Sequence, residues 1–83
     1  MSQEIKENDI ELDVRSLPHA RRHDTIFSLL EKLESKQALV ITNDHDPRPL
    51  GFQMRALYGD ETYSWTYIES GPEVWRVAIR KEA

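Results

Sequence analysis

The densest group of chemically active side chains in this sequence lies in residues 43–50, which read Asn-Asp-His-Asp-Pro-Arg-Pro-Leu. This segment holds two carboxylates, an imidazole and a guanidinium, and its two prolines restrict the backbone around them. Charged groups held beside prolines have fixed positions, so they either stabilise their own loop or meet a ligand. The other two histidines, His19 and His23, are four residues apart, a spacing that places both on one face of a helix.

One use of these residues is metal coordination. His23 and His45 are the best candidate ligands, with His19 as a weaker third member, and such a set suits zinc, iron, nickel or copper without choosing among them. The glutamate that follows the first histidine in the zinc-protease motif is absent. The structural alternative is that His45 forms a hydrogen bond within its own loop.

A second use is the binding of a small carboxylate, phosphate or sulfur oxyanion. The candidate residues for this site are Arg15, Arg22, Arg48, Asp44 and Asp46. Arginines and helix N-termini both favour anions, and basic residues at the start of a helix are unfavourable unless an anion lies there. The alternative is again structural: Arg48 pairs with one of the two aspartates, which themselves provide the anion.

Composition excludes several other classes of function. The 83 residues make one small domain without room for a buried catalytic cavity. With no cysteine there is no disulfide, thiolate nucleophile, persulfide carrier or cysteine-ligated metal. The net charge of −4 argues against nucleic acid as a partner, and no apolar run approaches the ~18 residues of a membrane span. No recognisable nucleophile–base pair accompanies the histidines, so we expect no catalytic residue and favour a non-enzymatic protein.

Periodicity predicts the elements that position these side chains. Apolar and acidic residues alternate over 10–14, which predicts a strand, and the continuous apolar run 38–41 predicts a buried central strand. Helical spacing predicts one helix over about 21–34 and a second from Pro49 to about Tyr58. The buried faces expected for the two helices are Ile26, Phe27, Leu29, Leu30 and Leu33, and Leu50, Met54 and Leu57.

The end of the chain predicts a hairpin whose turn is centred on Gly71. This turn would place Tyr67 opposite Trp75 on the core face. Trp65 would then lie opposite Val77. The predicted fold is thus α+β, a two-layer β-α-β-α-β-β sandwich with two helices on one face of a mixed four-stranded sheet. Because ligands of open α/β sheets bind beyond the carboxyl ends of parallel strands, we expect the histidines to gather there.

Several stretches carry a family resemblance: 12–17 (Leu-Asp-Val-Arg-Ser-Leu), 22–23 (Arg-His), 26–27 (Ile-Phe), 43–50, and 69–77 (Glu-Ser-Gly-Pro-Glu-Val-Trp-Arg-Val). Together they resemble a bacterial or archaeal domain of unknown function with a TusA/SirA-like, sulfur-carrier-like fold, over about residues 9–81. The resemblance implies association with hemerythrin-like or other redox-metal domains, to which such modules are often fused.

The sequence departs from the sulfur carriers at their catalytic Cys-Pro. His19 and Ala20 lie about where this pair would fall, so the resemblance does not imply persulfide transfer. The closer family favours another residue at position 19, which is why His19 ranks below His23 and His45.

These observations favour a small accessory domain that binds a metal ion or a small anion at the carboxyl ends of the parallel strands. The alternative is a protein-interaction module for a redox- or sulfur-related partner. It would use an edge strand or the exposed face of the sheet, namely Ser64, Thr66, Ile68, Arg76, Ala78 and Arg80. We expect a cytoplasmic protein, monomeric or weakly dimeric, with a loosely ordered N-terminal tail over residues 1–8.

Overall fold

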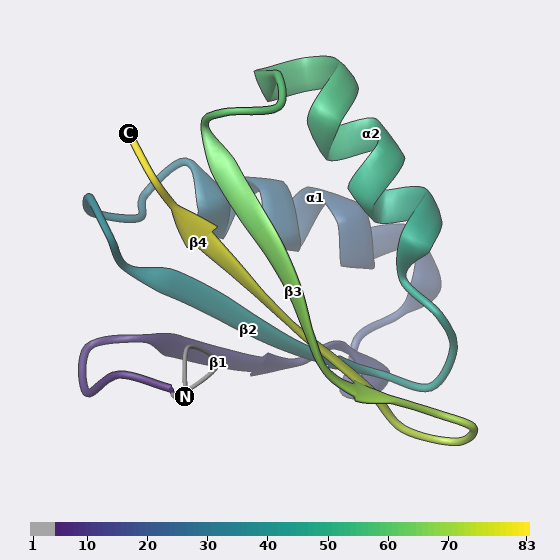
Figure 1. The fold of residues 1–83 in the computed structure, drawn as a ribbon. Helices are drawn as coiled ribbons and strands as arrows, with labels where there is room; N and C mark the ends of the chain where they lie inside the picture. Colours follow the sequence, from purple (N-terminus) through teal and green to yellow (C-terminus); the bar gives the residue numbers. More distant parts are fainter. Residues whose placement is uncertain (1–4) are drawn as a thin grey trace.

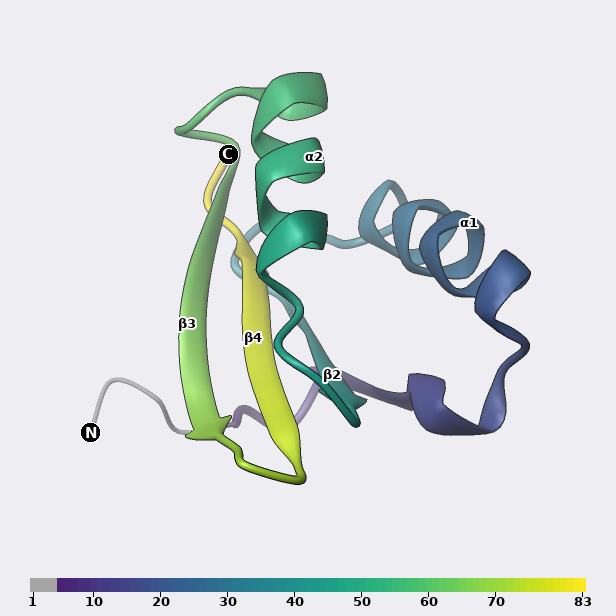
Figure 2. The same ribbon diagram turned by 90° about the vertical axis from the view of Figure 1, so that its right-hand side faces the viewer.

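Strands and helices alternate along the chain in the predicted order, as seen in a computed structural model that describes residues 5–83. The elements are β1 (Ile10–Asp13), the 3-10 turn η1 (Val14–Ser16), α1 (His19–Leu30), β2 (Ala38–Asn43), α2 (Arg48–Tyr58), β3 (Tyr63–Ser70) and β4 (Trp75–Lys81). Both helices cover the same face of the sheet (Figures 1 and 2). The predicted fold class is therefore confirmed.

The four strands lie in the order β1-β2-β4-β3, with β2 and β4 in the middle. β1 pairs with β2 in parallel, and the other two pairings are antiparallel. Asp13, the last residue of β1, is the partner of Thr42 near the end of β2. The carboxyl ends of the two parallel strands therefore lie side by side, as the position predicted for the site requires.

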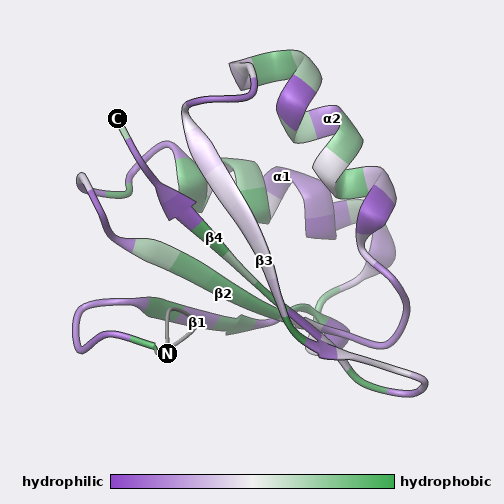
Figure 3. Ribbon diagram, in the orientation of Figure 1, coloured by the Kyte–Doolittle hydropathy of each residue, from purple (hydrophilic) through white to green (hydrophobic). Residues whose placement is uncertain are grey.

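The core lies between the sheet and the two helices. The middle strands β2 and β4 carry most of the strongly hydrophobic residues of the sheet (Figure 3). The fully buried side chains include Leu39, Ile41 and Ile79 from the strands and Ile26 and Leu30 from α1. Each such side chain contributes roughly 1.5–3 kcal/mol on burial, so this layer supplies the driving force that holds α1 in place.

Both helices differ in detail from the prediction. α1 begins at His19 and ends at Leu30, whereas the prediction ran from 21 to 34. Leu33 misled the prediction because it continues the helical spacing, but it reaches the core from the turn that follows α1. α2 begins at Arg48, one residue before the predicted Pro49.

The buried face of α2 was also predicted wrongly at one position. Leu57 is 61% exposed. The buried stripe instead follows steps of four residues, through Leu50, Met54 and the half-buried Tyr58. The Tyr58 ring packs edge-on against Tyr63, with 5.3 Å between the ring centroids, and this contact takes the place expected of Leu57.

The predicted hairpin register is wrong by two residues. Tyr67 pairs with Val77, and Trp75 pairs with Ser70. The connection is longer than a turn centred on Gly71, because it comprises residues 71–74 between the end of β3 and the start of β4. It is closed by a hydrogen bond of 2.9 Å from the Gly71 N–H to the carbonyl of Val74. A β-bulge after Tyr67 shifts the register once more.

The face of the sheet away from the helices is more covered than predicted. Ala78 is 8% exposed, and the neighbouring Val40 is 1% exposed. Arg80 forms an ion pair with Asp9 at 3.1 Å, and on the same face Arg76 forms one with Glu11 at 3.2 Å. Arginine stems commonly cover apolar surface in this way. The arginines expected to face a partner are thus engaged within the protein.

Two further predictions concern the ends and the surroundings of the chain. Of the predicted tail, residues 1–4 lie outside the described residues, and residues 6–9 form a turn in which the Asp9 N–H donates to the Lys6 carbonyl. Among residues 5–83, neither helix has the length and apolar character needed to span a membrane.

Candidate functional site

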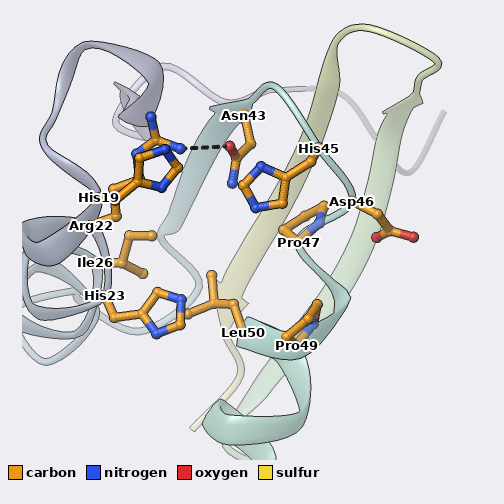
Figure 4. A pocket seen from close by; sticks show the side chains of 10 residues that line it. All are labelled: His19, Arg22, His23, Ile26, Asn43, His45, Asp46, Pro47, Pro49 and Leu50. Carbon is orange, nitrogen blue, oxygen red and sulfur yellow. Dashed lines mark hydrogen bonds between the residues drawn. The ribbon is translucent and has the colours of Figure 1, made fainter.

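A surface pocket of about 90 Å³ lies at the carboxyl ends of β1 and β2, between the start of α1 and the segment after β2 (Figure 4). Its lining consists of His19, Arg22, His23, Ile26, Asn43, His45, Asp46, Pro47, Pro49 and Leu50. The residues from α1 are spaced three or four apart and form one face of the helix. All three histidines of the chain therefore meet at one pocket.

The imidazoles lie at the solvent-exposed rim. His19 stacks with His45, with 6.5 Å between the ring centroids and 22° between the ring planes. His23 packs edge-on against Phe27 at 6.2 Å. His19 was the least favoured of the three histidines in the sequence analysis, yet it contacts His45. It does so from the first residue of α1, which begins two residues earlier than predicted.

His45 is held by its neighbour in the loop. Its Nδ1 lies 2.7 Å from Oδ1 of Asp44. This hydrogen bond is the main reason that the pKa of the Asp44 carboxyl lies below its usual range, with a smaller contribution from Arg22. The bond fixes the orientation of the ring, as the structural alternative for His45 predicts. Within the described residues, Nε2 of the ring has no hydrogen-bond partner.

Arg22 forms the floor of the pocket and is 7% exposed. Its guanidinium donates to the carbonyl oxygens of Leu17 (3.2 Å) and Arg15 (3.5 Å). A third bond, at 3.3 Å, reaches Oδ1 of the buried Asn43 (Figure 4), and Oδ1 of Asp44 lies 3.6 Å away. Arg22 thus joins η1, α1 and the end of β2. Its donors are mostly used within the protein rather than free for an anion.

The other two candidate arginines lie outside the pocket lining. Arg15 binds Asp13 through Nε and Nη2, at 2.8 and 2.6 Å, and these bonds lower the pKa of Asp13 to about 2. Arg48 pairs with Asp46 at 3.3 Å, as its structural alternative predicts. It lines a separate groove beside Phe52. The structure therefore brings the histidines together, but not the arginines.

Asp46 belongs to the frame of the loop. Its carboxylate points away from the pocket (Figure 4). There it accepts hydrogen bonds from the Tyr67 hydroxyl at 2.7 Å and from the Arg48 N–H at 3.1 Å. The contact with Tyr67 was missed because nothing local in the sequence connects this loop with β3. Asn43 was missed as well, although its place at the end of a buried strand is a usable signal.

The two helix N-termini differ in what they offer a ligand. α1 has Pro18 at its cap position, with no side-chain cap and no acidic residue in the first turn. α2 starts between Pro47 and Pro49, which have no N–H, and the Arg48 N–H already binds Asp46. The sequence analysis considered both helix N-termini as anion sites. Of the two, only the N-terminus of α1 keeps its partial positive charge without a capping or acidic side chain.

Within residues 5–83, no group of three or more histidine, aspartate, glutamate or cysteine side chains is arranged to hold a metal ion. Coordination by His23 and His45 stays a prediction. The polar groups that line the pocket include the imidazole nitrogens, which donate hydrogen bonds when protonated, as well as the side chains of Arg22 and Asn43 at its floor.

Comparison with known proteins identifies a family for this chain. No curated protein and no solved structure matches the chain. Residues 11–81 match a family of conserved proteins, and this segment runs from β1 through β4 and includes every residue that lines the pocket. The chain belongs to this family, the uncharacterized conserved proteins DUF2249.

Proposed function

We propose that this protein is a non-enzymatic accessory domain that binds a small anion, a carboxylate or a phosphorus or sulfur oxyanion, in the histidine pocket. The observation that carries the proposal is the meeting of His19, His23 and His45 at one pocket whose two neighbouring carboxylates are already hydrogen-bonded, Asp44 to His45 and Asp46 to Tyr67. The pocket can therefore present several donors and no free carboxylate to a bound anion.

The electrostatics of the pocket depend on protons. Asp44 is offset by Arg22, and Asp46 by Arg48. Net positive charge therefore arises when imidazoles are protonated, in addition to the partial charge at the start of α1. Histidine is the side chain that gains and loses charge between about pH 5 and 8. Anion binding should accordingly weaken as the pH rises through this range.

The volume limits the ligand to a small one. A water molecule takes up ~30 Å³ of the liquid, so a pocket of about 90 Å³ has the volume of roughly three water molecules. Acetate, phosphate, sulfate and sulfite, with four or five non-hydrogen atoms each, are of about this size. Larger acids would have to extend past the exposed rings into solvent.

The test is a titration of the protein with acetate, phosphate, sulfate and sulfite at pH 5.5 and pH 8, followed by the NMR signals of the histidine rings. We expect saturable shifts in the millimolar range at pH 5.5 and much weaker binding at pH 8. The double variant His23→Ala/His45→Ala should lose binding. The double variant Lys32→Ala/Arg55→Ala removes two positive charges outside the pocket lining and should keep it.

Two outcomes would overturn the anion site. One is the absence of saturable shifts with all four anions at pH 5.5, and the other is unchanged binding after removal of both imidazoles. The same protein is titrated with zinc, nickel, copper and iron. Metal binding that depends on His23 and His45, without anion binding, would replace the anion with a transition metal ion at this site.

The wider setting rests on the family resemblance alone. We propose a TusA/SirA-like fold, supported by the β-α-β-α-β-β order, and a cytoplasmic bacterial or archaeal module that serves a redox-metal or sulfur-pathway protein. Co-purification of a hemerythrin-like or sulfur-transfer protein with the tagged chain, lost on substitution of a surface residue, is the corresponding test.

A further inference from the structure

The two edges of the sheet differ in how they are protected. Unpaired strand edges recruit other strands unless they are short, charged or covered. β1 has four residues, of which Glu11 and Asp13 are charged. β3 has eight residues, and from Tyr63 to Ile68 it carries neither a charge nor a proline. The β3 edge therefore lacks the features that protect β1.

The main-chain groups that face the open side of β3 can be identified. The Glu82 N–H donates to the Thr62 carbonyl at 2.8 Å, so this residue pair is hydrogen-bonded across the hairpin. Bonded and non-bonded pairs alternate in an antiparallel ladder. The N–H and C=O groups of Tyr63, Trp65 and Tyr67 consequently point to the open side. No element of residues 5–83 pairs with them there (Figures 1 and 2).

The side chains of the same three residues are fixed on the helix side of the sheet. The Tyr63 hydroxyl donates to the Leu30 carbonyl at 2.9 Å, and the Tyr67 hydroxyl donates to Asp46. The Trp65 ring lies against Gly51, close enough that an added Cβ would be 3.4 Å from it. An additional strand could therefore pair with this edge without displacing any core side chain.

Exposed acidic residues flank this uncharged stretch at both ends. Asp60 and Glu61 precede it, and Glu69 and Glu73 follow it. Among these four, Asp60 alone has an ion pair within the described residues, with Arg55 at 3.3 Å. The open edge is thus acidic at both ends and uncharged in the middle.

This charge pattern selects the partner. In an antiparallel pairing of two copies of β3, Glu69 of each copy would approach Glu61 of the other, and like charges across strands are destabilising. A segment with an uncharged centre and lysine or arginine at both ends would be complementary to the edge instead. We propose that the β3 edge binds such an extended, basic-ended segment of another protein, which joins the sheet as a fifth strand.

The length of the segment follows from the geometry. Glu61 and Glu69 are eight residues apart, which corresponds to ~26 Å in an extended strand. The bulge after Tyr67 limits regular pairing to residues 63–67. A partner segment of about nine residues, with its basic residues at the two ends, spans this distance. The proposal does not rest on the anion pocket, and its test is a separate one.

The probe is a fluorescent nine-residue peptide, Lys-Val-Thr-Val-Thr-Val-Thr-Val-Lys, whose binding is measured by anisotropy at low and physiological salt. The matched peptides carry glutamate in place of both lysines, or proline in place of the central threonine. We expect weak saturable binding of the first peptide, at least tenfold weaker binding of the other two, and slower hydrogen exchange at the amides of Tyr63, Trp65 and Tyr67.

The protein variant for this test is Glu61→Lys/Glu69→Lys, which should reverse the preference and bind the glutamate peptide better. The control Asp24→Lys/Glu34→Lys makes the same change in net charge at exposed sites away from β3 and should leave binding unchanged. Circular dichroism verifies folding of both. Equal binding of all peptides, no binding at millimolar concentration, protection confined to other amides, or concentration-dependent self-association through β3 would each overturn the proposal.

Discussion

Replacing Arg22 with methionine tests whether this residue is part of the frame or a ligand-binding group. Methionine keeps much of the aliphatic stem but removes every donor. The carbonyl oxygens of Leu17 and Arg15 then lose the guanidinium, and Asp44 loses a positive neighbour. Asn43 is affected less, because its Oδ1 still accepts the Asp44 N–H at 2.8 Å.

The expected cost follows from the number and the length of these bonds. A hydrogen bond from a charged donor contributes ~1.5–3 kcal/mol, and the two bonds to carbonyls are long, so we take the lower end for each and expect a loss of about 2–4 kcal/mol. In a domain of this size, each ~1 kcal/mol lowers Tm by roughly 4–8 °C, so Tm should fall by at least ~8 °C.

The assay is urea denaturation at pH 7, monitored by tryptophan fluorescence, with thermal unfolding as a second measurement. Arg21→Met is the matched control, since Arg21 is the exposed neighbour on α1 and its side chain makes no hydrogen bond or ion pair within the described residues. A difference between the two variants of less than ~0.5 kcal/mol would refute the argument that the buried guanidinium holds this corner together.

Three further predictions concern single residues. Gly71→Ala should lower the free energy of unfolding by ~2 kcal/mol or more, because φ is +77° and the new Cβ would lie 2.6 Å from the Trp75 ring. Urea denaturation measures this free energy, and an unchanged value would contradict the packing of Gly71 against Trp75. Gly51→Ala should instead stabilise by ~0.5–1 kcal/mol in the same assay, because alanine favours the helix and its Cβ makes an ordinary contact at 3.4 Å. Asp13 has its pKa lowered from 3.8 to about 2, mainly by the hydrogen bond from Arg15, so its contribution to stability is present above about pH 4 and is lost as the pH falls toward 2. Unfolding measured between pH 6 and pH 2 should show a smaller decline for Asp13→Asn than for the original protein, and parallel curves would contradict this linkage.

The elements were predictable because their patterns are local. Alternation over residues 10–14 and the apolar run over 38–41 each reflect one strand and one environment. The errors arose where a distant contact decides the outcome. Leu33 satisfies the helical spacing but is buried from a turn, and Leu57 gives way to Tyr58 because Tyr63 is available as a neighbour.

The meeting of the three histidines at one pocket was predictable, but the pairing of the charged residues around them was not. Parallel pairing of β1 and β2 was enough to bring the loops that carry His19, His23 and His45 together. Whether an arginine is free or paired depends on acceptors that sequence spacing does not reveal. Arg22 finds main-chain carbonyls in the 3-10 turn η1 and the loop before α1, which the periodicity did not predict.

The pocket and the β3 edge are separate surfaces, yet one hydrogen bond connects them. Tyr67 has its main chain at the open side of β3 and its hydroxyl on Asp46, which in turn holds the first residue of α2. A strand that pairs with Tyr67 would restrict this side chain and, through Asp46, the loop that positions His45. We expect the coupling to be positive: a partner that orders the loop in its present conformation raises the affinity for the anion. By linkage, the anion then raises the affinity for the partner by the same factor. Tyr67→Phe removes the connection while leaving both surfaces in place, so it should abolish the mutual effect and leave each separate affinity almost unchanged.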